Sequence, residues 1–526
     1  MKKNNFTILF ILCSYFFYSN FIISSERKNN LILWGVRNNI AQLPTSFIHP
    51  KEKERRELKA EAEKQAEELY KQSFKPSPFI KIAKKNNRWR RPEPEVSRFS
   101  CNRKGETVLH VAVRTDDEEA VKEILNHTFL VNEEDLEGNS PLHVACKKGN
   151  TRIVALLLPH TDNPNRRNFA LQAPLHIACE NNFQDVAQLL CDDQRTEINE
   201  KNADRSTALH VVCRNNYLVL LNILLATNRQ PKHALNINLC NKAGLSPLHF
   251  ACMFNSLKTA ERLLKLKNSI DPNMEAYDGS TPLHNAIECS NNDIVALLLT
   301  CKDINPTIQD TVVIYIPHTN NSINQPNNTP LHIACLKKNA TAVKLLLTYK
   351  PQRSYESWKK VNPNTQNADS LTPLHITVTN EDIEITTLLL NIDPNEHWID
   401  PNCGDGNTTT PLHIACYKKN PILVKLLLEH DDILPSLSFP DVPTPLHIAV
   451  ANQDIETVRL FMNHKKVASV INQKHYDEDR QSHTPLDFAH QTKNNEITEL
   501  LLQYGAKASE IKSSKLMTHT NITVLM

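Results

Sequence analysis

One short motif recurs along most of this 526-residue chain and limits what the chain can fold into. Its fullest form reads Thr-Pro-Leu-His-x-Ala, and successive copies lie 33 to 48 residues apart. Repetition at such a period predicts a stack of similar units, each burying its apolar faces against its neighbours. An eleventh copy has Asp487 in place of the histidine, and the other ten centre on His110, His143, His176, His210, His249, His284, His332, His375, His413 and His447.

Each copy predicts a pair of short helices. Thr329 suits the N-cap of one first helix, since its hydroxyl can accept an N–H of the first turn, and Pro330 suits the first helical position. A second apolar block follows ten to fifteen residues later, as in AVKLLL after His332. Asparagine tolerates positive φ better than most residues, so asparagines in the turn account for the presence of only nine glycines. We expect positive φ at Asn182, Asn216, Asn255, Asn339, Asn420, Asn452 and Asn495.

The motif, its period and the second apolar block together resemble the ankyrin repeat, in about eleven copies over residues 99–506. The resemblance implies an all-α solenoid of helix-turn-helix units with loops projecting from one face. It also implies a non-catalytic protein-protein interaction scaffold that holds a protein partner with its concave face and loops. The end units depart from the pattern, as caps should: Val108 replaces the proline in the first, and Asp487 replaces the histidine in the last.

The amino terminus has the pattern of a secretory signal peptide. Lys2 and Lys3 precede an apolar run that ends near Phe17, which is shorter than the ~20 residues that a membrane-spanning helix needs. We therefore predict a signal peptide over residues 1–25 and a secreted or secretory-pathway protein. An uncleaved anchor is the alternative, in which case the chain would be a membrane-anchored adaptor or an accessory subunit of a larger complex; a buried amphipathic start is a third.

The segments that flank the array are short. Residues 26–98 are predicted to form a charged helical segment and a basic linker, and residues 507–526 a C-terminal tail. A catalytic domain would not fit into either segment, so we expect no enzyme and no catalytic residues. The sequence also lacks the glycine-rich nucleotide-binding motifs and the zinc motif HExxH, so we expect no cofactor, no metal and no small-molecule substrate.

Charge is unevenly distributed along the chain. The whole sequence has 60 basic and 58 acidic residues, but residues 92–526 have 41 basic and 50 acidic ones. A mildly acidic array argues against a broad phosphate-binding surface. We therefore expect a protein partner, no nucleic acid, and no membrane contact beyond the N-terminal signal.

Six copies of the motif place a cysteine three residues after the histidine, as in His332 and Cys335. Such a pair could contribute to a metal site or a nucleophile–base pair, but two ligands do not make a zinc site. The resemblance implies instead that the histidine stabilises a turn and that the cysteine fills the core. Equivalent helices pack about 8–10 Å apart, too far for a disulfide between them. This cysteine usage is typical of a reducing compartment and conflicts with the signal peptide; export into another cell's cytoplasm would reconcile the two.

Three longer spacings predict insertions, at about residues 303–328, 349–369 and 391–409. Repeat arrays place variable loops on one face, often the binding face. The partner-binding residues that we predict there are Trp358, Trp398 and Tyr355, because exposed aromatic side chains often anchor an interface. Packing of these loops on themselves is the alternative.

Overall fold

The computed structural model describes residues 101–508, apart from short gaps. The predicted signal peptide and charged segment, and nearly all of the C-terminal tail, lie outside the described residues. The gaps fall at 128–129, 228–233, 267–268, 311–312, 316–321, 325–326, 353–358, 394–396, 407, 438, 440–441 and 477–481.

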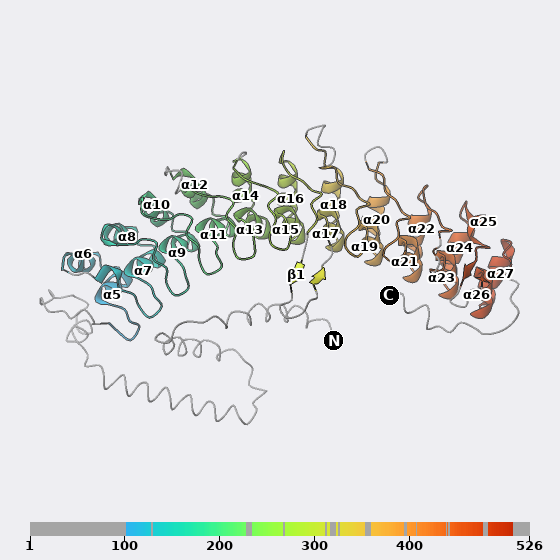
Figure 1. Cartoon of the computed structure of the whole chain (residues 1–526), viewed down its shortest axis with the longest axis horizontal. Helices are drawn as coiled ribbons and strands as arrows, with labels where there is room; N and C mark the ends of the chain where they lie inside the picture. The colour runs from blue at the N-terminus through green and yellow to red at the C-terminus, as the bar shows by residue number, and fades with distance from the viewer. Residues whose placement is uncertain are drawn as a thin grey trace, which may run out of the picture. The chain divides into compact units, whose positions relative to one another are not determined.

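Eleven helix pairs follow one another along the chain, as the motif predicts. Figure 1 shows the first helices of the pairs in one row and the second helices in another, both in chain order. The first helices are α5 (Val108–Arg114), α7 (Pro141–Lys148), α9 (Pro174–Glu180), α11 (Ala208–Arg214), α13 (Pro247–Met253), α15 (Pro282–Glu288), α17 (Pro330–Leu336), α19 (Pro373–Thr379), α21 (Pro411–Tyr417), α23 (Pro445–Ala451) and α26 (Pro485–Gln491). The second helices are α6 (Glu118–His127), α8 (Thr151–Leu157), α10 (Gln184–Asp192), α12 (Leu218–Ala226), α14 (Leu257–Leu264), α16 (Asn292–Leu299), α18 (Ala340–Leu347), α20 (Ile383–Leu390), α22 (Pro421–Leu428), α24 (Ile455–Met462) and α27 (Asn495–Gln503).

The core is a continuous layer between neighbouring pairs. Each first helix contacts the first helices of the adjacent units, and the second helices stack in the same way. In the unit of α17, Leu331, Ala334 and Cys335 are fully buried, and Leu346 of α18 is fully buried too. No single pair of such short helices could bury these side chains alone, so stability depends on the stack. The fold is the all-α repeat solenoid that the motif predicts.

The turn between the two helices of each unit holds one residue at positive φ. The prediction is correct for Asn182, Asn216 and Asn255. It is wrong for four other units, in which this position belongs to Lys338, Lys419, Gln453 and Lys493 rather than to Asn339, Asn420, Asn452 and Asn495.

The asparagines of two of these units serve as N-caps of the second helix. The Oδ1 atom of Asn339 accepts the main-chain N–H of Ala342 at 3.0 Å, and Asn420 caps α22 in the same manner. An N-cap residue keeps a negative φ, so the left-handed conformation falls on the residue before it. Lys338 and Lys419 occupy that position because the asparagine that follows each of them is the N-cap residue.

Short additional elements lie in the connections. The strands β1 (Val313–Tyr315) and β2 (Ser322–Asn324) pair antiparallel within the first predicted insertion. A helix α25 (Val467–Val470) and a hairpin of β3 (His475–Tyr476) and β4 (Ser482–His483) precede the last unit, where no insertion was predicted. Two short 3-10 helices are η1 (Leu130–Asn132) and η2 (Leu158–His160).

No helix in the described part of the chain has both the length and the hydropathy to cross a membrane.

Candidate functional site

The motif histidine joins each unit to the next. The Nδ1 atom of His332 lies 3.2 Å from the main-chain nitrogen and 2.8 Å from the hydroxyl of Thr329. Because Nδ1 accepts the main-chain N–H, the ring proton is on Nε2. Nε2 lies 3.0 Å from the carbonyl oxygen of Leu371 in the following unit and donates to it. One side chain therefore closes the turn before its own helix and holds the turn before the next one.

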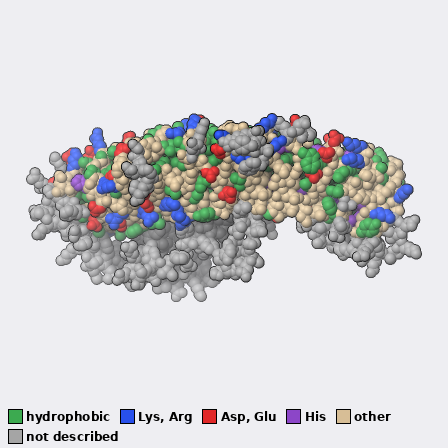
Figure 2. Space-filling view, turned by 45° about the horizontal axis from the view of Figure 1, so that its top comes forward, with side chains coloured by type: hydrophobic (Ala, Val, Ile, Leu, Met, Phe, Trp, Pro, Cys, Tyr) green, Lys and Arg blue, Asp and Glu red, His purple; other side chains and the backbone are tan. Residues whose placement is uncertain are grey.

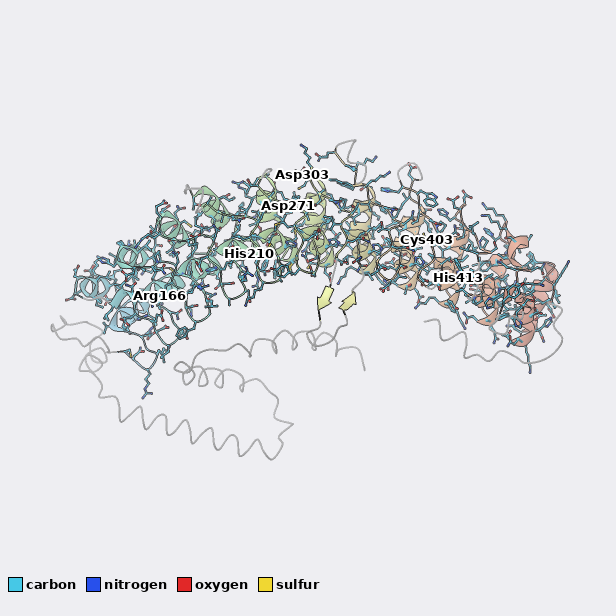
Figure 3. The ribbon with its side chains drawn as sticks, viewed as in Figure 1. Arg166, His210, Asp271, Asp303, Cys403 and His413 are labelled. Carbon is cyan, nitrogen blue, oxygen red and sulfur yellow. The ribbon has the colours of Figure 1, made fainter. Side chains whose placement is uncertain are left out.

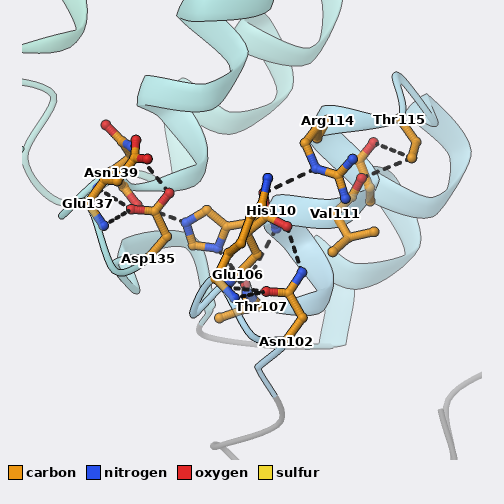
Figure 4. Close-up of polar contacts among 12 residues, drawn as sticks. Asn102, Glu106, Thr107, His110, Val111, Arg114, Thr115, Asp135, Glu137 and Asn139 are labelled. Carbon is orange, nitrogen blue, oxygen red and sulfur yellow. Dashed lines mark hydrogen bonds and ion pairs between the residues drawn. The ribbon is translucent and has the colours of Figure 1, made fainter. Parts of the chain in front are cut away.

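Eight other histidines of the motif make the same link at 2.9 to 3.1 Å. Figure 4 shows the first of these links, from His110 to Asn139. In the unit of α21, His413 keeps its Nδ1 contact with Thr410 at 2.7 Å, while its Nε2 has no hydrogen-bond partner. The other acceptors are the carbonyl oxygens of Gln172, Ser206, Leu245, Ser280, Asn328, Thr409 and His483.

Burial sets the protonation state of these side chains. Desolvation lowers the pKa of His332 to about 4, so its ring is neutral at pH 7. The thiol of Cys335 is fully buried, and burial raises its pKa, which keeps it protonated. Both ring nitrogens of His332 are already hydrogen-bonded and the thiol lies in the core, so the pair is structural and cannot act as nucleophile and base. The described residues contain no group of three or more His, Cys, Asp or Glu side chains that could hold a metal ion.

A ladder of asparagine side chains joins the units at a second edge. The Nδ2 atom of Asn273 donates to the carbonyl of Asp303 at 2.7 Å, and its Oδ1 accepts the N–H of Asn305 at 2.7 Å. Figure 3 shows Asp271 and Asp303 in the loops after the second helices, whereas His210 lies among the first helices. The amide thus forms the two hydrogen bonds that a neighbouring strand would make.

The ladder was not predicted from the sequence. The sequence does contain a signal for it, which is a constant spacing and not a local motif. In seven units an asparagine lies eleven residues before the next motif histidine. The equivalent residue in the unit of α16 is Asn305, whose side chain bonds, among the described residues, only Thr307 two residues on, so the ladder is interrupted before the second predicted insertion. The members that bridge to the next unit are Asn132, Asn165, Asn199, Asn238, Asn273, Asn364, Asn402 and Asn472.

Apolar side chains remain accessible at the carboxyl ends of some first helices. Phe254 is 46% exposed and Leu336 is 45% exposed. The guanidinium carbon of Arg214 lies 4.9 Å from the ring centre of Phe254, and the ring centres of Phe250 and Phe254 are 6.0 Å apart. Aromatic residues and arginine are enriched at the centres of protein interfaces, so this is the candidate partner-binding surface.

Exposed apolar side chains also occur at the tips of the loops that precede the first helices. Phe169 is 69% exposed, and Tyr277 is 71% exposed. Each packs against a glycine at the preceding tip, Gly138 and Gly244, which both have positive φ and leave no space for a Cβ. The tips are therefore held against one another, and their outward side chains have fixed positions.

The predicted partner-binding residues are only partly described. Trp398 is 57% exposed, its Nε1 donates to Asp432 at 3.3 Å, and its carbonyl accepts the Asn364 amide at 2.8 Å. Trp358 and Tyr355 lie outside the described residues. Their role in binding stays a prediction.

A family model described as ankyrin repeats (3 copies) matches nearly all of the array. The matched residues are 79–168, 168–234, 230–310, 308–397, 355–436 and 435–511. The chain belongs to the ankyrin-repeat family. The resemblance and the fold class predicted from the motif are thus confirmed, and proteins of this family typically serve as interaction modules.

Individual relatives of this ankyrin-repeat protein match only segments. The human transient receptor potential cation channel subfamily A member 1 is 27% identical over 176 residues, which are 29% of this chain and 15% of that protein. The putative ankyrin repeat protein FPV031 of fowlpox virus is 37% identical over 71 residues, 13% of this chain and 21% of that protein. The crystal structure of the Bcl-3 ankyrin repeat domain is 24% identical with a TM-score of 0.38, and the similarity covers 46% of this chain and 98% of that one. The chain therefore spans about a fifth or less of the two relatives' own lengths.

Proposed function

We propose that this ankyrin-repeat protein is a non-catalytic scaffold that binds a protein partner along the first-helix face and the projecting loops. The observation that carries the proposal is the exposed apolar surface formed by Phe254, with Arg214 stacked on it, and Leu336 two units further along. A soluble scaffold gains nothing in stability from such side chains in water, whereas a partner would desolvate them.

The chemistry of the array also supports binding rather than catalysis. The motif histidines are buried and neutral, and in all of them except His413 both ring nitrogens are used in links within and between units. Seven of the twelve described cysteines are buried. The histidines of the motif and most of the cysteines are therefore committed to the core of the array, while Phe254, Leu336 and Arg214 are of the types that form interfaces.

Export is part of the proposal. The pattern of Lys2 and Lys3 followed by an apolar run supports entry into a secretory pathway, and the free thiols support work in a reducing compartment. A protein that is exported and then acts inside another cell would meet both conditions. The alternative is a membrane-anchored adaptor that keeps its first 25 residues. Fractionation of the tagged full-length chain, with the mass of its N-terminus, separates the two: a cytosolic protein with Met1 intact would contradict export, and a membrane-bound one would favour the adaptor.

Affinity capture tests the binding surface. The full chain and a Phe254→Ala/Leu336→Ala variant are immobilised at equal density, and captured proteins are quantified by mass spectrometry. The matched control is Leu502→Ala, which truncates an equally exposed leucine on α27. We expect the double variant to lose specific partners severalfold and the control to keep them. Equal capture by all three proteins would contradict this site.

A further inference from the structure

A row of residues follows the carboxyl ends of the first helices, and we call it the turn ridge. In each unit it consists of the fourth to sixth residues after the motif histidine, or after Asp487 in the last unit, as in Leu336, Lys337 and Lys338 after His332. The ridge carries nine basic residues against four acidic ones, although residues 92–526 as a whole have an excess of nine acidic residues. The basic members are Arg114, Lys147, Lys148, Arg214, Lys337, Lys338, Lys418, Lys419 and Lys493, and the acidic members are Asp116, Glu180, Glu288 and Glu381.

Several of these cations remain available to a ligand. Arg114, Lys148 and Lys337 form ion pairs with nearby carboxylates, and Lys338 donates to a main-chain oxygen. The ion pairs found in the described part of the chain include none to the other basic members of the ridge. These are Lys147, Arg214, Lys418, Lys419 and Lys493.

Uncharged side chains interrupt the basic ones. Phe254 and Leu336 are the exposed apolar members, and Tyr417 is half-buried with a phenol oxygen that has no hydrogen-bond partner. A cation near a helix carboxyl end stabilises that helix, which explains part of the basic excess. That effect does not explain the exposure of Phe254 or Leu336, because an uncharged side chain does not interact favourably with the helix dipole.

The opposite edge of the first helices has mixed charge, with Arg205 and Lys242 at the tips before α11 and α13 but acidic residues at two tips further along. Asp278 and Asp369 are exposed at loop tips that precede α15 and α19. Helices of seven residues are about 10 Å long, so at least that length separates the row of loop tips from the ridge. A ligand that lies along the first helices would place its negative charges toward the ridge and away from these tips.

We propose that the turn ridge binds an acidic segment of a partner protein, in which Asp or Glu alternates with aromatic or aliphatic residues. This proposal rests on the proposed function, since it specifies the chemistry of the partner for the same face. The carboxylates pair with Lys418, Lys419, Lys147 and Arg214, and the apolar side chains contact Phe254 and Leu336. A polyanion such as a nucleic acid would leave those apolar contacts unused. The face drawn in Figure 2 likewise shows basic and acidic side chains interspersed, without a broad basic field.

A random peptide library tests the proposal without a known partner. The full chain is panned against phage-displayed 25-residue peptides, which reach about 80 Å when extended, and the enriched peptides are synthesised with a fluorophore for anisotropy titrations. The test variant carries Lys147→Glu, Arg214→Glu, Lys418→Glu and Lys419→Glu. The matched control carries the same four charge changes on or next to second helices, at Arg152, Lys258, Lys302 and Lys425. Circular dichroism shows whether each variant is folded, and a labelled 20-nucleotide oligothymidylate serves as the polyanion probe.

We expect the enriched peptides to be acidic and partly apolar, and to bind the test variant about tenfold or more weakly while the control changes less than about twofold. Their dissociation constants for the unaltered chain should also rise with salt, a readout that survives even if the test variant does not fold. Neutral or basic peptides, equal binding by the test variant, salt-independent binding, or tighter binding of the oligonucleotide than of any peptide would overturn the proposal. Enrichment of no peptide at all would instead count against the proposed function.

Discussion

His332 and Leu371 belong to neighbouring units, and the Nε2 atom of His332 lies 3.0 Å from the main-chain oxygen of Leu371. The link is present at nine of the ten motif histidines, so nearly every unit positions the turn that starts the next. Asp487 in the last motif copy reproduces only half of it: Oδ2 accepts the N–H and the hydroxyl of Thr484 at 2.7 and 2.8 Å. An ionised carboxylate has no N–H with which to donate to a carbonyl of a further unit, as Nε2 of the histidine does.

Replacing His332 with alanine should therefore destabilise the array. The change leaves the N–H of Thr329 buried without its partner and removes the link to the carbonyl of Leu371, which keeps the N–H of Asn367. We expect it to lower the free energy of unfolding by about 1 to 3 kcal/mol. Urea unfolding followed by circular dichroism measures the effect. The control is His160→Ala, which removes an exposed histidine outside the motif and should change the urea midpoint little. Equal effects of the two substitutions would contradict the joint role of His332.

The histidines also predict a loss of stability in mild acid. Burial lowers the pKa of His332 and His249 to about 4, and that of His447 to about 3. Above pH 6.5 the ring is neutral in both states and adds nothing to the pH dependence. Between pH 6.5 and about 4 the unfolded chain binds the proton and the folded one does not. Stability should then fall by roughly 1.4 kcal/mol per pH unit for each such histidine.

Urea midpoints at pH 7.5, 6.0 and 5.0 measure this slope. Asp310 and Glu180 work in the opposite direction, because burial raises both pKa values, that of Asp310 to about 6, but they are two groups against ten motif histidines. A His332→Gln/His249→Gln variant should be less stable at pH 7.5 and should lose less stability on acidification than the unaltered chain. A midpoint that stays constant from pH 7.5 to 5.0 would refute the assignment.

The repeat architecture could be predicted because one motif indicates both the start of each first helix and the number of units. Thr329 and Pro330 indicate where a helix begins, and the spacing of the copies gives the number of units. The position of the left-handed turn residue could not be predicted from asparagine alone, since Asn339 suits an N-cap as well as a positive φ. The ladder of Asn273 and its equivalents depends on contacts between units, which residue propensities do not contain.

The candidate surface was harder to predict than the fold. The insertions directed attention to Trp398, which is exposed but already donates to Asp432. Phe254 and Leu336 follow the motif at positions whose side chains vary from unit to unit, so no pattern marks them. Their exposure is visible only once the neighbouring helices are in place.

The asparagine ladder predicts a second stability effect. Asn273→Ala removes both hydrogen bonds to the next unit and should lower the free energy of unfolding by about 1 to 3 kcal/mol. Asn305→Ala is the matched control, because its side chain bonds only the nearby Thr307. Hydrogen exchange should also quicken at the amide of Asn305 in the first variant. If both alanine variants unfold at the same urea concentration, the ladder has no special role.

The turn before α24 tests which residue adopts the left-handed conformation, Asn452 as the sequence predicted or Gln453 as the structure has it. Gln453 has a φ of 56° and Asn452 a φ of −76°. Gln453→Gly should stabilise the array by about 0.5 to 1 kcal/mol, because glycine adopts the left-handed conformation without strain. Asn452→Gly should destabilise it, because the amide loses its bond to the carbonyl of Cys416. Thermal unfolding of the two variants measures the signs, and reversed signs would place the left-handed residue at Asn452.

Trp398, in a projecting loop, should contribute to partner binding and little to stability. Its indole is more than half exposed, and the single hydrogen bond to Asp432 at a solvent-exposed site contributes little to stability. Trp398→Ala should therefore leave the thermal midpoint nearly unchanged, while capture of a partner from a lysate falls severalfold. Trp398→Phe keeps most of the apolar surface and should retain most of the capture. Leu502→Ala is the control for loss of an exposed apolar side chain elsewhere. If Trp398→Ala captures the same proteins in the same amounts as the unaltered chain, this loop is not part of the binding surface, and the first-helix face alone carries the function.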